Sequence, residues 1–341
     1  MSAEPKELVL GGQAVIEGVM MKGADSYAVA VRKAGGEILV RDFPLSRGAV
    51  QRRFSKTPVV RGVVTMGAML VIGYRALQFS ADEAIADADA EEARAKAGAA
   101  ATDGPGASPE GRDAPPAADG AAPQAARADG SGLAMAGALA LALLLGVGLF
   151  FWLPLVATRG ISALVPALSG RIAFNLVDGV VRVLVFIGYV LAIGAIRDIR
   201  RIFEYHGAEH KVVNAYEAKA DLSPEGVASF SCLHPRCGTS FLLFVMVISI
   251  AVFSFIPHDS SLLTKALMRL PLLPAVAGIS YEVLRLSARK AGTPLFRALV
   301  APGLLLQRLT TREPDLRQIE VAIASFRRVA PGRGTEAGLV G

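Results

Sequence analysis

The chain has 341 residues, of which 52% are hydrophobic and 19% are charged, and its formal net charge is +6. The apolar residues are concentrated in long runs, which argues against a pair of soluble domains and indicates a polytopic membrane protein. The positive charge suits anionic lipid headgroups. Because no aromatic-basic motif accompanies it, we expect a lipid bilayer as partner and no nucleic acid.

The N-terminal part, residues 8–58, is predicted to form a small β-rich cytosolic unit. Its short apolar or alternating runs, broken by glycines, cover residues 14–16, 27–31 and 37–40. The pair Gly35-Gly36 predicts a hairpin turn. Glu17 lies in a stretch with few other polar side chains, so its carboxylate is either turned to the surface or kept for metal binding or proton transfer. The residues alone favour the surface turn.

Residues 59–80 have a helical pattern, but the apolar part between Arg61 and Arg75 gives only about 20 Å of helix. This length is short for a span, so it favours an interfacial or re-entrant helix over a further crossing. The following residues 81–131 are rich in Ala, Gly, Pro and Asp, with hardly any large apolar side chains. Such a segment buries too little surface to offset its ordering entropy, and we predict a disordered linker.

Four apolar runs are expected to cross the membrane as two pairs of helices, within residues 132–196 and 240–285. The runs are residues 133–157, 179–196, 241–257 and 266–284. The chain ends in a cytosolic or interfacial segment, residues 286–341. In residues 313–329 the apolar side chains follow a spacing of three and four, which predicts an amphipathic helix suited to docking a membrane-protein partner.

The placement of lysine and arginine predicts which loops are cytoplasmic. The segment before the first run carries 15 of them, the loop from Arg197 to Ser240 carries six, and the tail from Arg285 carries ten. The other two connections carry two and one. Because basic residues are enriched in cytoplasmic loops, we expect both termini and the loop 197–239 on the cytoplasmic side of the membrane.

That loop holds five of the six histidines and cysteines of the chain within 32 residues. They are His206, His210, Cys232, His234 and Cys237. Imidazole and thiolate are the groups that zinc and similar divalent metals prefer. A cytosolic location keeps the two cysteines reduced, which favours metal binding over a disulfide.

Residues 204–219 contain good helix formers, and a helix there would place His206, Glu209 and His210 on one face. This H-x-x-E-H pattern is the inverted zincin motif, in which two imidazoles hold a metal and the carboxylate accepts a proton from water. Glu217 returns to the same face three turns later, as a third ligand or a partner of a ligand. The alternative is a pair of exposed histidines beside solvated glutamates.

The second cluster, Cys232, His234 and Cys237, has the spacing C-x-H-x-x-C, which differs from the C-x-x-C of zinc ribbons. Alone, it also fits two cysteines packed as small hydrophobic residues. Together the clusters offer more ligands than the four that zinc usually takes. Two interpretations therefore stay open, a catalytic site with an open position and a closed structural site.

Four segments of the chain resemble the YqhQ-like family of bacterial inner-membrane proteins. They are residues 11–21 (GGQAVIEGVMM), 204–211 (EYHGAEHK), 234–241 (HPRCGTSF) and 309–314 (LTTREP). The resemblance covers nearly the whole chain apart from the linker, and it implies a metal-dependent enzyme of the inner membrane without a defined substrate. It also implies that Glu17 belongs to the site, together with the histidines, cysteines and Glu209.

We therefore expect an α-helical polytopic membrane protein, with about four transmembrane helices, interfacial helices and a small N-terminal β-rich unit. The leading hypothesis is a zinc-dependent hydrolase of peptides or amides, with Glu209 and Glu17 as the catalytic candidates. His206 and His210 would bind zinc, and Cys232, His234, Cys237 or Glu217 would complete the site. The alternative is a membrane scaffold or assembly factor with structural zinc. A metal transporter fits less well, because the spans contain few ligands.

Overall fold

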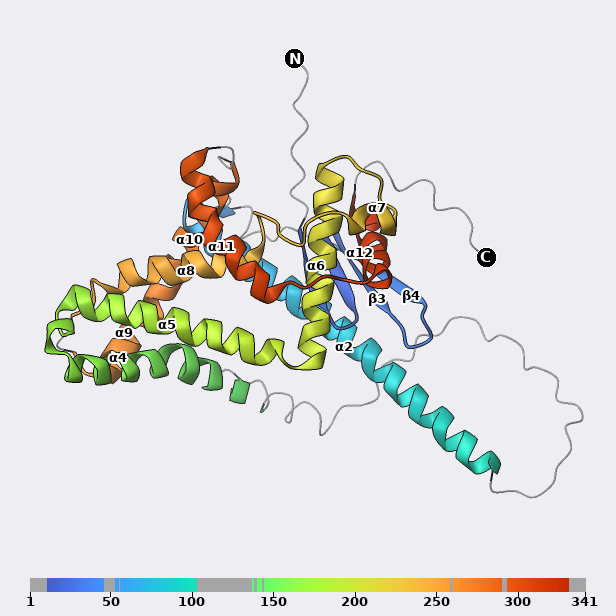
Figure 1. Ribbon diagram of the computed structural model, residues 1–341, viewed down its shortest axis with the longest axis horizontal. Coiled ribbons are helices and arrows are strands. Elements are labelled where there is room, and N and C mark those ends of the chain that lie inside the picture. Colours follow the sequence, from blue (N-terminus) through green and yellow to red (C-terminus); the bar gives the residue numbers. More distant parts are fainter. Residues whose placement is uncertain are drawn as a thin grey trace, which may run out of the picture.

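The computed structural model describes residues 11–45, 53–54, 56–102, 137, 140–142, 144–257, 260–289 and 293–330. This part of the chain forms a bundle of apolar helices and, beside it, a unit built on a four-stranded sheet (Figure 1). The predicted fold class, a helical membrane protein with a small N-terminal β-rich unit, is confirmed. His258 lies outside the described residues.

The sheet is antiparallel, with the strand order β1-β2-β3-β4. Its strands are β1 (Gly11–Val15), β2 (Gly18–Lys22), β3 (Ser26–Arg32) and β4 (Ile38–Pro44). β1 and β2 are joined by a tight turn in which Glu17 has a φ of 50°. The turn between β3 and β4 contains Gly36 with a φ of 90°, a conformation that favours glycine, and the predicted hairpin at Gly35-Gly36 is confirmed.

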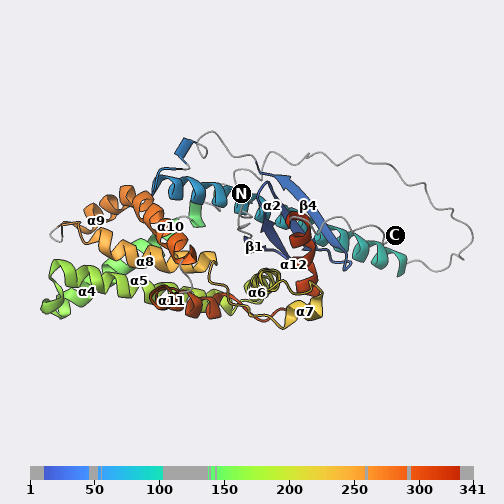
Figure 2. The same cartoon turned by 90° about the horizontal axis from the view of Figure 1, so that it is seen from above.

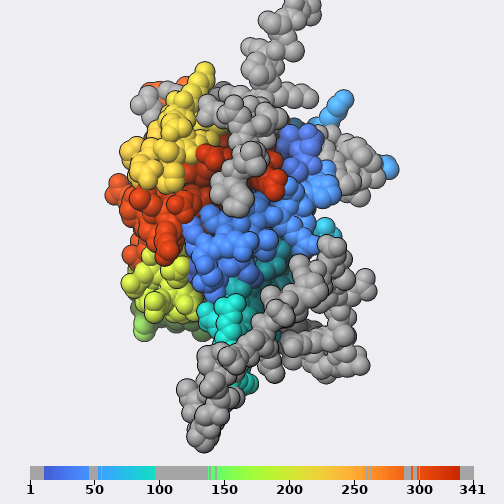
Figure 3. Space-filling model, turned by 90° about the vertical axis from the view of Figure 1, so that its right-hand side faces the viewer, coloured from blue at the N-terminus to red at the C-terminus, as the bar shows by residue number. Residues whose placement is uncertain are grey.

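Both faces of the sheet are covered by helices, because alternate side chains of a strand point to opposite sides. On one side Val19, Met21 and Ala30 belong to a buried cluster with residues of α6 (Arg197–Glu217) and α12 (Leu316–Val329). On the other side the strands bury a second cluster with α2 (Val60–Thr102), formed by Val15, Met20, Tyr27, Val29, Val31, Ala76 and Phe79. From the end of the molecule opposite the bundle, the strands and α12 are seen next to each other (Figure 3).

The amphipathic helix expected near the C-terminus is α12, which begins with a capping box of Asp315 and Gln318. Its apolar residues Ile319, Ile323 and Phe326 are buried against the sheet and α6. The apolar face is therefore occupied within the chain. A free apolar face was the reason for predicting a membrane-protein partner at this helix, and that reason no longer holds.

Four helices of the described residues are long and apolar enough to cross a membrane. They are Val60–Lys96, Ala140–Leu164, Arg171–Gly194 and Leu263–Ser287. The chain is thus a multi-pass membrane protein in contact with a lipid bilayer. The expected run 241–257 corresponds to α8 (Gly238–Phe253), whose 16 residues extend about 24 Å. The bundle also contains α4 (Leu153–Leu164), α5 (Arg171–Gly194) and α11 (Pro294–Thr310).

The last candidate span is interrupted. It consists of α9 (Leu262–Arg269), a short 3-10 turn (Leu270–Leu272) and α10 (Leu273–Arg289). Pro271 lies within this turn, where its ring prevents a regular α-helical hydrogen bond.

α2 differs from the expectation for residues 81–131. Residues 81–102, predicted to begin a disordered linker, continue the helix to Thr102. The prediction gave too little weight to Ala, Glu, Lys and Arg as strong helix formers, in a stretch that contains no proline. The rest of the predicted linker, residues 103–131, lies outside the described residues. Near its start α2 packs on α10, where Gly62 lies against Tyr281, and further along Phe79 packs on the sheet. α2 therefore connects the bundle with the sheet.

Candidate metal centre

α6 follows directly after α5 and runs across the ends of α5 and α8 instead of continuing their direction (Figures 1 and 2). The helix predicted over residues 204–219 is confirmed, although α6 ends at Glu217. Gly207 allows the loop before α12 to approach α6 closely, because a Cβ at this position would lie 2.0 Å from the Arg312 carbonyl oxygen. Helix α6 thus lies between the bundle and the sheet.

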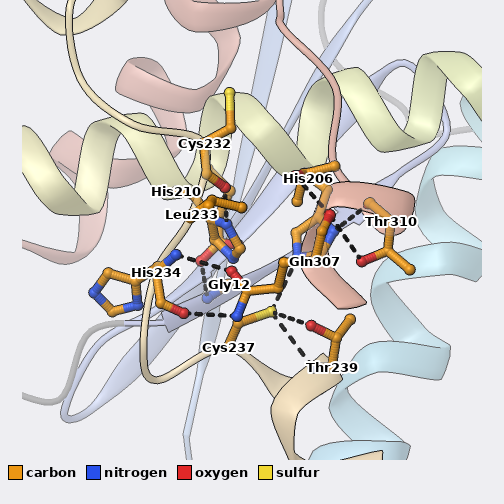
Figure 4. Close-up of polar contacts among 12 residues, drawn as sticks. Gly12, His206, His210, Cys232, Leu233, His234, Cys237, Thr239, Gln307 and Thr310 are labelled. Atoms are coloured by element: carbon orange, nitrogen blue, oxygen red, sulfur yellow. Dashed lines mark hydrogen bonds and ion pairs between the residues drawn. The ribbon is translucent and has the colours of Figure 1, made fainter. Parts of the chain in front are cut away.

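Within the part of the chain that the structure describes, one group of at least three potential metal ligands comes together: His206, His210 and Cys237. Their ligand atoms lie within 4.8 Å of one another, and His206 Nε2 is 3.3 Å from Cys237 Sγ (Figure 4). A tetrahedral zinc ion with ordinary bond lengths needs about 3.5 Å between such atoms. The three side chains therefore fit a zinc ion after shifts of about 1 Å.

Both imidazoles are held by backbone carbonyl groups. His206 Nδ1 donates to the Thr310 oxygen at 2.8 Å, and His210 Nδ1 donates to the Cys232 oxygen at 2.5 Å. Because a carbonyl group only accepts, each neutral ring carries its lone pair on Nε2, the atom that faces the other ligands. His210 is 1% exposed, and its Nε2 has no hydrogen-bond partner among the described residues. A buried lone pair of this kind, beside a second imidazole and a thiol, is typical of a metal ligand.

Cys237 is the N-cap residue of α8, the helix that enters the bundle. Its Sγ accepts a hydrogen bond from the Thr239 backbone N–H at 3.4 Å and lies 3.3 Å from the Thr239 hydroxyl oxygen. These contacts with Thr239 hold the sulfur atom at the start of α8, on the side of His206.

Glu209 lies next to the three ligands. One carboxylate oxygen accepts a hydrogen bond from the Gly12 N–H at 2.8 Å, and the other lies 3.6 Å from His210 Nε2. Strand β1 can approach this closely only because residue 12 is glycine, since a Cβ there would lie 2.8 Å from Glu209 Cγ. Gly12 thus brings a backbone donor to the carboxylate, and Glu209 borders the three potential ligands.

Cys232 contributes its backbone to the centre and not its sulfur atom, which points away from Cys237 (Figure 4). The Cys232 Sγ lies 3.2 Å from a carboxylate oxygen of Glu313, to which it donates. Burial raises the pKa of this thiol to about 12, and the hydrogen bond to Glu313 adds to the effect. Its surroundings therefore favour a neutral thiol.

His234 lies beside the centre, with its ring centroid 5.9 Å from that of His210. Its Nε2 is 3.4 Å from a Glu217 oxygen, without hydrogen-bond geometry, and Glu217 is also paired with Arg236. Burial lowers the pKa of His234, against an opposing effect of the Glu209 charge. His234 and Glu217 thus form a neighbouring pair outside the group of three ligands.

Glu17 is placed elsewhere on α6. Its carboxylate binds the Arg201 guanidinium with both oxygens and accepts a longer hydrogen bond of 3.3 Å from the Tyr205 hydroxyl. Arg201 precedes Glu209 by eight residues, or about 12 Å along the helix. The turn also borders a cavity of about 460 Å³ between the β3–β4 hairpin and α2. The structure therefore separates Glu17 from the histidines and gives it a role in attaching the first hairpin to α6.

Gln307, at the C-terminal end of α11, is a site residue that the sequence pattern did not indicate. It is 0% exposed, and its side chain accepts from the His234 N–H at 2.9 Å and donates to the His234 carbonyl oxygen at 2.8 Å. A further contact of 3.2 Å joins it to the Ser240 hydroxyl oxygen. Three residues later, Thr310 supplies the carbonyl group that orients His206. The available signal was the Gln-Arg-Leu-Thr-Thr sequence, partly inside a segment of the family resemblance.

Comparison with known proteins agrees with the resemblance seen in the sequence. Residues 57–331 match the model of a family described as "Protein of unknown function (DUF1385)". The chain belongs to this family. It is 32% identical over 325 residues to the uncharacterized protein YqhQ of Bacillus subtilis (strain 168), an alignment that covers 93% of this chain and 90% of the relative. No solved structure matches the chain. The family description names no activity.

Proposed function

We propose that this protein is a zinc-dependent hydrolase whose centre lies at the cytoplasmic surface of a bacterial inner membrane. The observation that carries the proposal is the buried, unpartnered Nε2 of His210, beside His206 Nε2 and Cys237 Sγ. Two histidines and one cysteine leave a fourth position of a tetrahedral metal open, as in catalytic zinc sites. The basic residues of the loop 197–240 and of both termini support the cytoplasmic orientation.

A zinc ion held there would act as a Lewis acid and lower the pKa of water at the open position toward about 7. Glu209 would accept the proton of that water, because its second carboxylate oxygen lies near His210 Nε2 while Gly12 holds the first. His206 and His210 are kept in the tautomer required for binding by the two carbonyl groups. Peptides or amides are the proposed substrates, since proton abstraction from water beside a Lewis acid suits their hydrolysis.

The centre lies where α6 crosses the end of α8 and where Cys237 caps α8. A substrate would therefore reach it at the boundary between membrane and cytosol. This position favours a membrane-associated substrate over one that diffuses freely.

A structural zinc site in a scaffold protein is the second candidate. It is supported by the burial of Glu209, which is 5% exposed, and by its distance of 3.6 Å from His210 Nε2. With a shift of the carboxylate, Glu209 would close the tetrahedron as a fourth ligand and leave no open position.

The metal content of detergent-purified protein, measured by mass spectrometry, tests the proposal. We expect nearly one zinc per wild-type chain, loss of zinc in His210→Ala and Cys237→Ser, and retention in Glu209→Gln. Cys232→Ser is the matched control and should keep zinc, because its sulfur points away from the centre. Wild-type protein without metal contradicts the whole proposal, whereas loss of zinc from Glu209→Gln favours the structural site.

The hydrolase part is then tested with fluorogenic peptide and amide substrates incorporated with the protein into lipid vesicles. Removal of a general base lowers the rate by about 100- to 10,000-fold, so zinc-loaded Glu209→Gln should be almost inactive. Equal rates in wild type and zinc-loaded Glu209→Gln would exclude Glu209 as the base.

A further inference from the structure

A cluster of charged side chains lies inside the helical bundle, at a distance from the metal centre. Asp178 and Arg182 are one turn apart on α5, and Arg269 is the last residue of α9. They are 3%, 8% and 1% exposed, within segments that are apolar enough to cross a membrane. Charged residues at this depth are costly in a bilayer and usually serve a function.

One carboxylate is shared by two guanidinium groups. Asp178 Oδ2 lies 2.9 Å from Arg182 Nη2 and 3.0 Å from Arg269 Nη2, and Asp178 Oδ1 accepts from Arg269 Nη1 at 3.3 Å. Arg182 also reaches the Ser249 hydroxyl oxygen at 3.5 Å. The two guanidinium groups and the single carboxylate therefore leave an excess of one positive charge.

Aromatic rings compensate part of this excess. The ring of Phe253, which is 1% exposed, has Arg269 Cζ at 4.9 Å and Arg182 Cζ at 5.4 Å from its centroid. Such contacts stabilise a cation, but the ring does not accept hydrogen bonds from the N–H groups, which point outward in the plane of the guanidinium. The Nε atoms of Arg182 and Arg269 are buried and have no hydrogen-bond partner among the described residues.

The path of the chain at Arg269 is also unusual. α9 ends there, and the 3-10 turn with Pro271 follows before α10 begins. Interrupted helices with charged residues at the break are a common way to build a ligand site inside a membrane protein. On α5, Asp178 and Arg182 lie about 10 and 16 Å from the helix start at Arg171, in the half of the bundle remote from α6.

We propose that the Arg182–Arg269 pair binds a phosphate group in the half of the bundle remote from the metal centre. The unpartnered Nε–H groups of the two arginines can donate to such a group, and its negative charge balances the excess positive charge. A phospholipid phosphate and a free phosphate ion share this chemistry. The site is independent of the metal centre and of the proposed hydrolase.

The test is the thermal unfolding midpoint of the full chain in neutral detergent, at constant ionic strength. Inorganic phosphate and phosphatidylglycerol are added in separate series. We expect a saturable rise of about 3 °C in wild type with one of them. A rise with phosphate identifies a soluble anion, and a rise with phosphatidylglycerol alone identifies a lipid headgroup. No rise in either series overturns the proposal.

Variants distinguish this site from surface binding. Arg269→Gln should abolish the rise, whereas Arg200→Gln, which removes an exposed arginine of α6, should leave it unchanged. Asp178→Asn removes the resident carboxylate and should enlarge the rise, which keeps the test decisive if Arg269→Gln does not fold. A rise of the same size in wild type, Arg269→Gln and Asp178→Asn would mean that the anion binds elsewhere.

Discussion

Gln307→Ala removes the side chain that fastens the cysteine loop to α11. In the wild type this amide pairs with both the N–H and the carbonyl group of His234, much as a neighbouring strand would. Gln307 is fully buried, so the substitution leaves the His234 N–H and the Ser240 hydroxyl without this partner. The His234 carbonyl oxygen keeps only its 3.3 Å hydrogen bond from the Cys237 N–H. Cys237 lies three residues after His234, so the same change loosens one metal ligand.

The size of the effect follows from the lost hydrogen bonds. Each buried polar group left without a partner costs about 1–3 kcal/mol, and water entering the space recovers part of this. We expect the free energy of unfolding to fall by about 2–4 kcal/mol, which corresponds to a midpoint about 3–6 °C lower for a chain of this length. If half of this cost falls on the metal-bound loop, zinc affinity decreases by roughly 10-fold.

The assay is thermal unfolding in detergent with and without a chelator, followed by competition with a coloured zinc chelator. Gln78→Ala is the control, because Gln78 is exposed on α2 and its loss should change stability by less than about 0.5 kcal/mol. If Gln307→Ala unfolds at the same temperature as Gln78→Ala and binds zinc equally well, Gln307 does not fasten the loop.

Three further substitutions test other contacts of the site. Gly12→Ala places a Cβ 2.4 Å from the Met20 carbonyl oxygen and 2.8 Å from Glu209 Cγ, so it should destabilise the protein by about 1–3 kcal/mol. The control Gly11→Ala, whose Cβ meets nothing within 4 Å, should be neutral, and equal unfolding midpoints for the two variants would contradict the close approach at Gly12. Glu17→Gln should weaken the attachment of the first hairpin to Arg201 but leave the zinc content unchanged. Loss of zinc from this variant would mean that Glu17 belongs to the metal centre. Lys211→Met breaks the contacts of a buried ammonium group with the Ala228 and Phe230 carbonyl oxygens and with Glu313, and should lower the free energy of unfolding by about 2–4 kcal/mol. Lys219→Met, at an exposed position, is the control, and similar melting curves for the two variants would refute a stabilising role of Lys211.

The parts of the site that lie on one helix could be predicted from spacing. His206, Glu209 and His210 share a face of α6 because three- and four-residue separations always do so in a helix. The hairpin at Gly35-Gly36 was predictable for a similar reason, since the conformation of a tight turn depends on a few adjacent residues.

The cysteine loop shows where such local reasoning ends. Its spacing gave no means to decide which of Cys232 and Cys237 turns inward, because an irregular loop has no fixed periodicity. The direction of the Cys232 sulfur depends on Glu313, which is 81 residues away in the chain, and Gln307 is 73 residues from its partner His234. Likewise, Glu17 could be assigned to Arg201 only after the strand and α6 had been placed side by side.

The pairing of the first strands with the last helix has a consequence for synthesis of the protein. Met21 donates to the Ser325 hydroxyl, and Gly12 reaches Glu209, across 304 and 197 residues. At ordinary translation rates of about 5–20 residues per second, the strands leave the ribosome roughly 15–60 s before α12 can cover them. The apolar side chains that α12 later buries stay uncovered while the bundle inserts into the membrane. The nascent chain is therefore most vulnerable to aggregation or proteolysis during membrane insertion, and a truncation before α12 should expose the N-terminal sheet permanently.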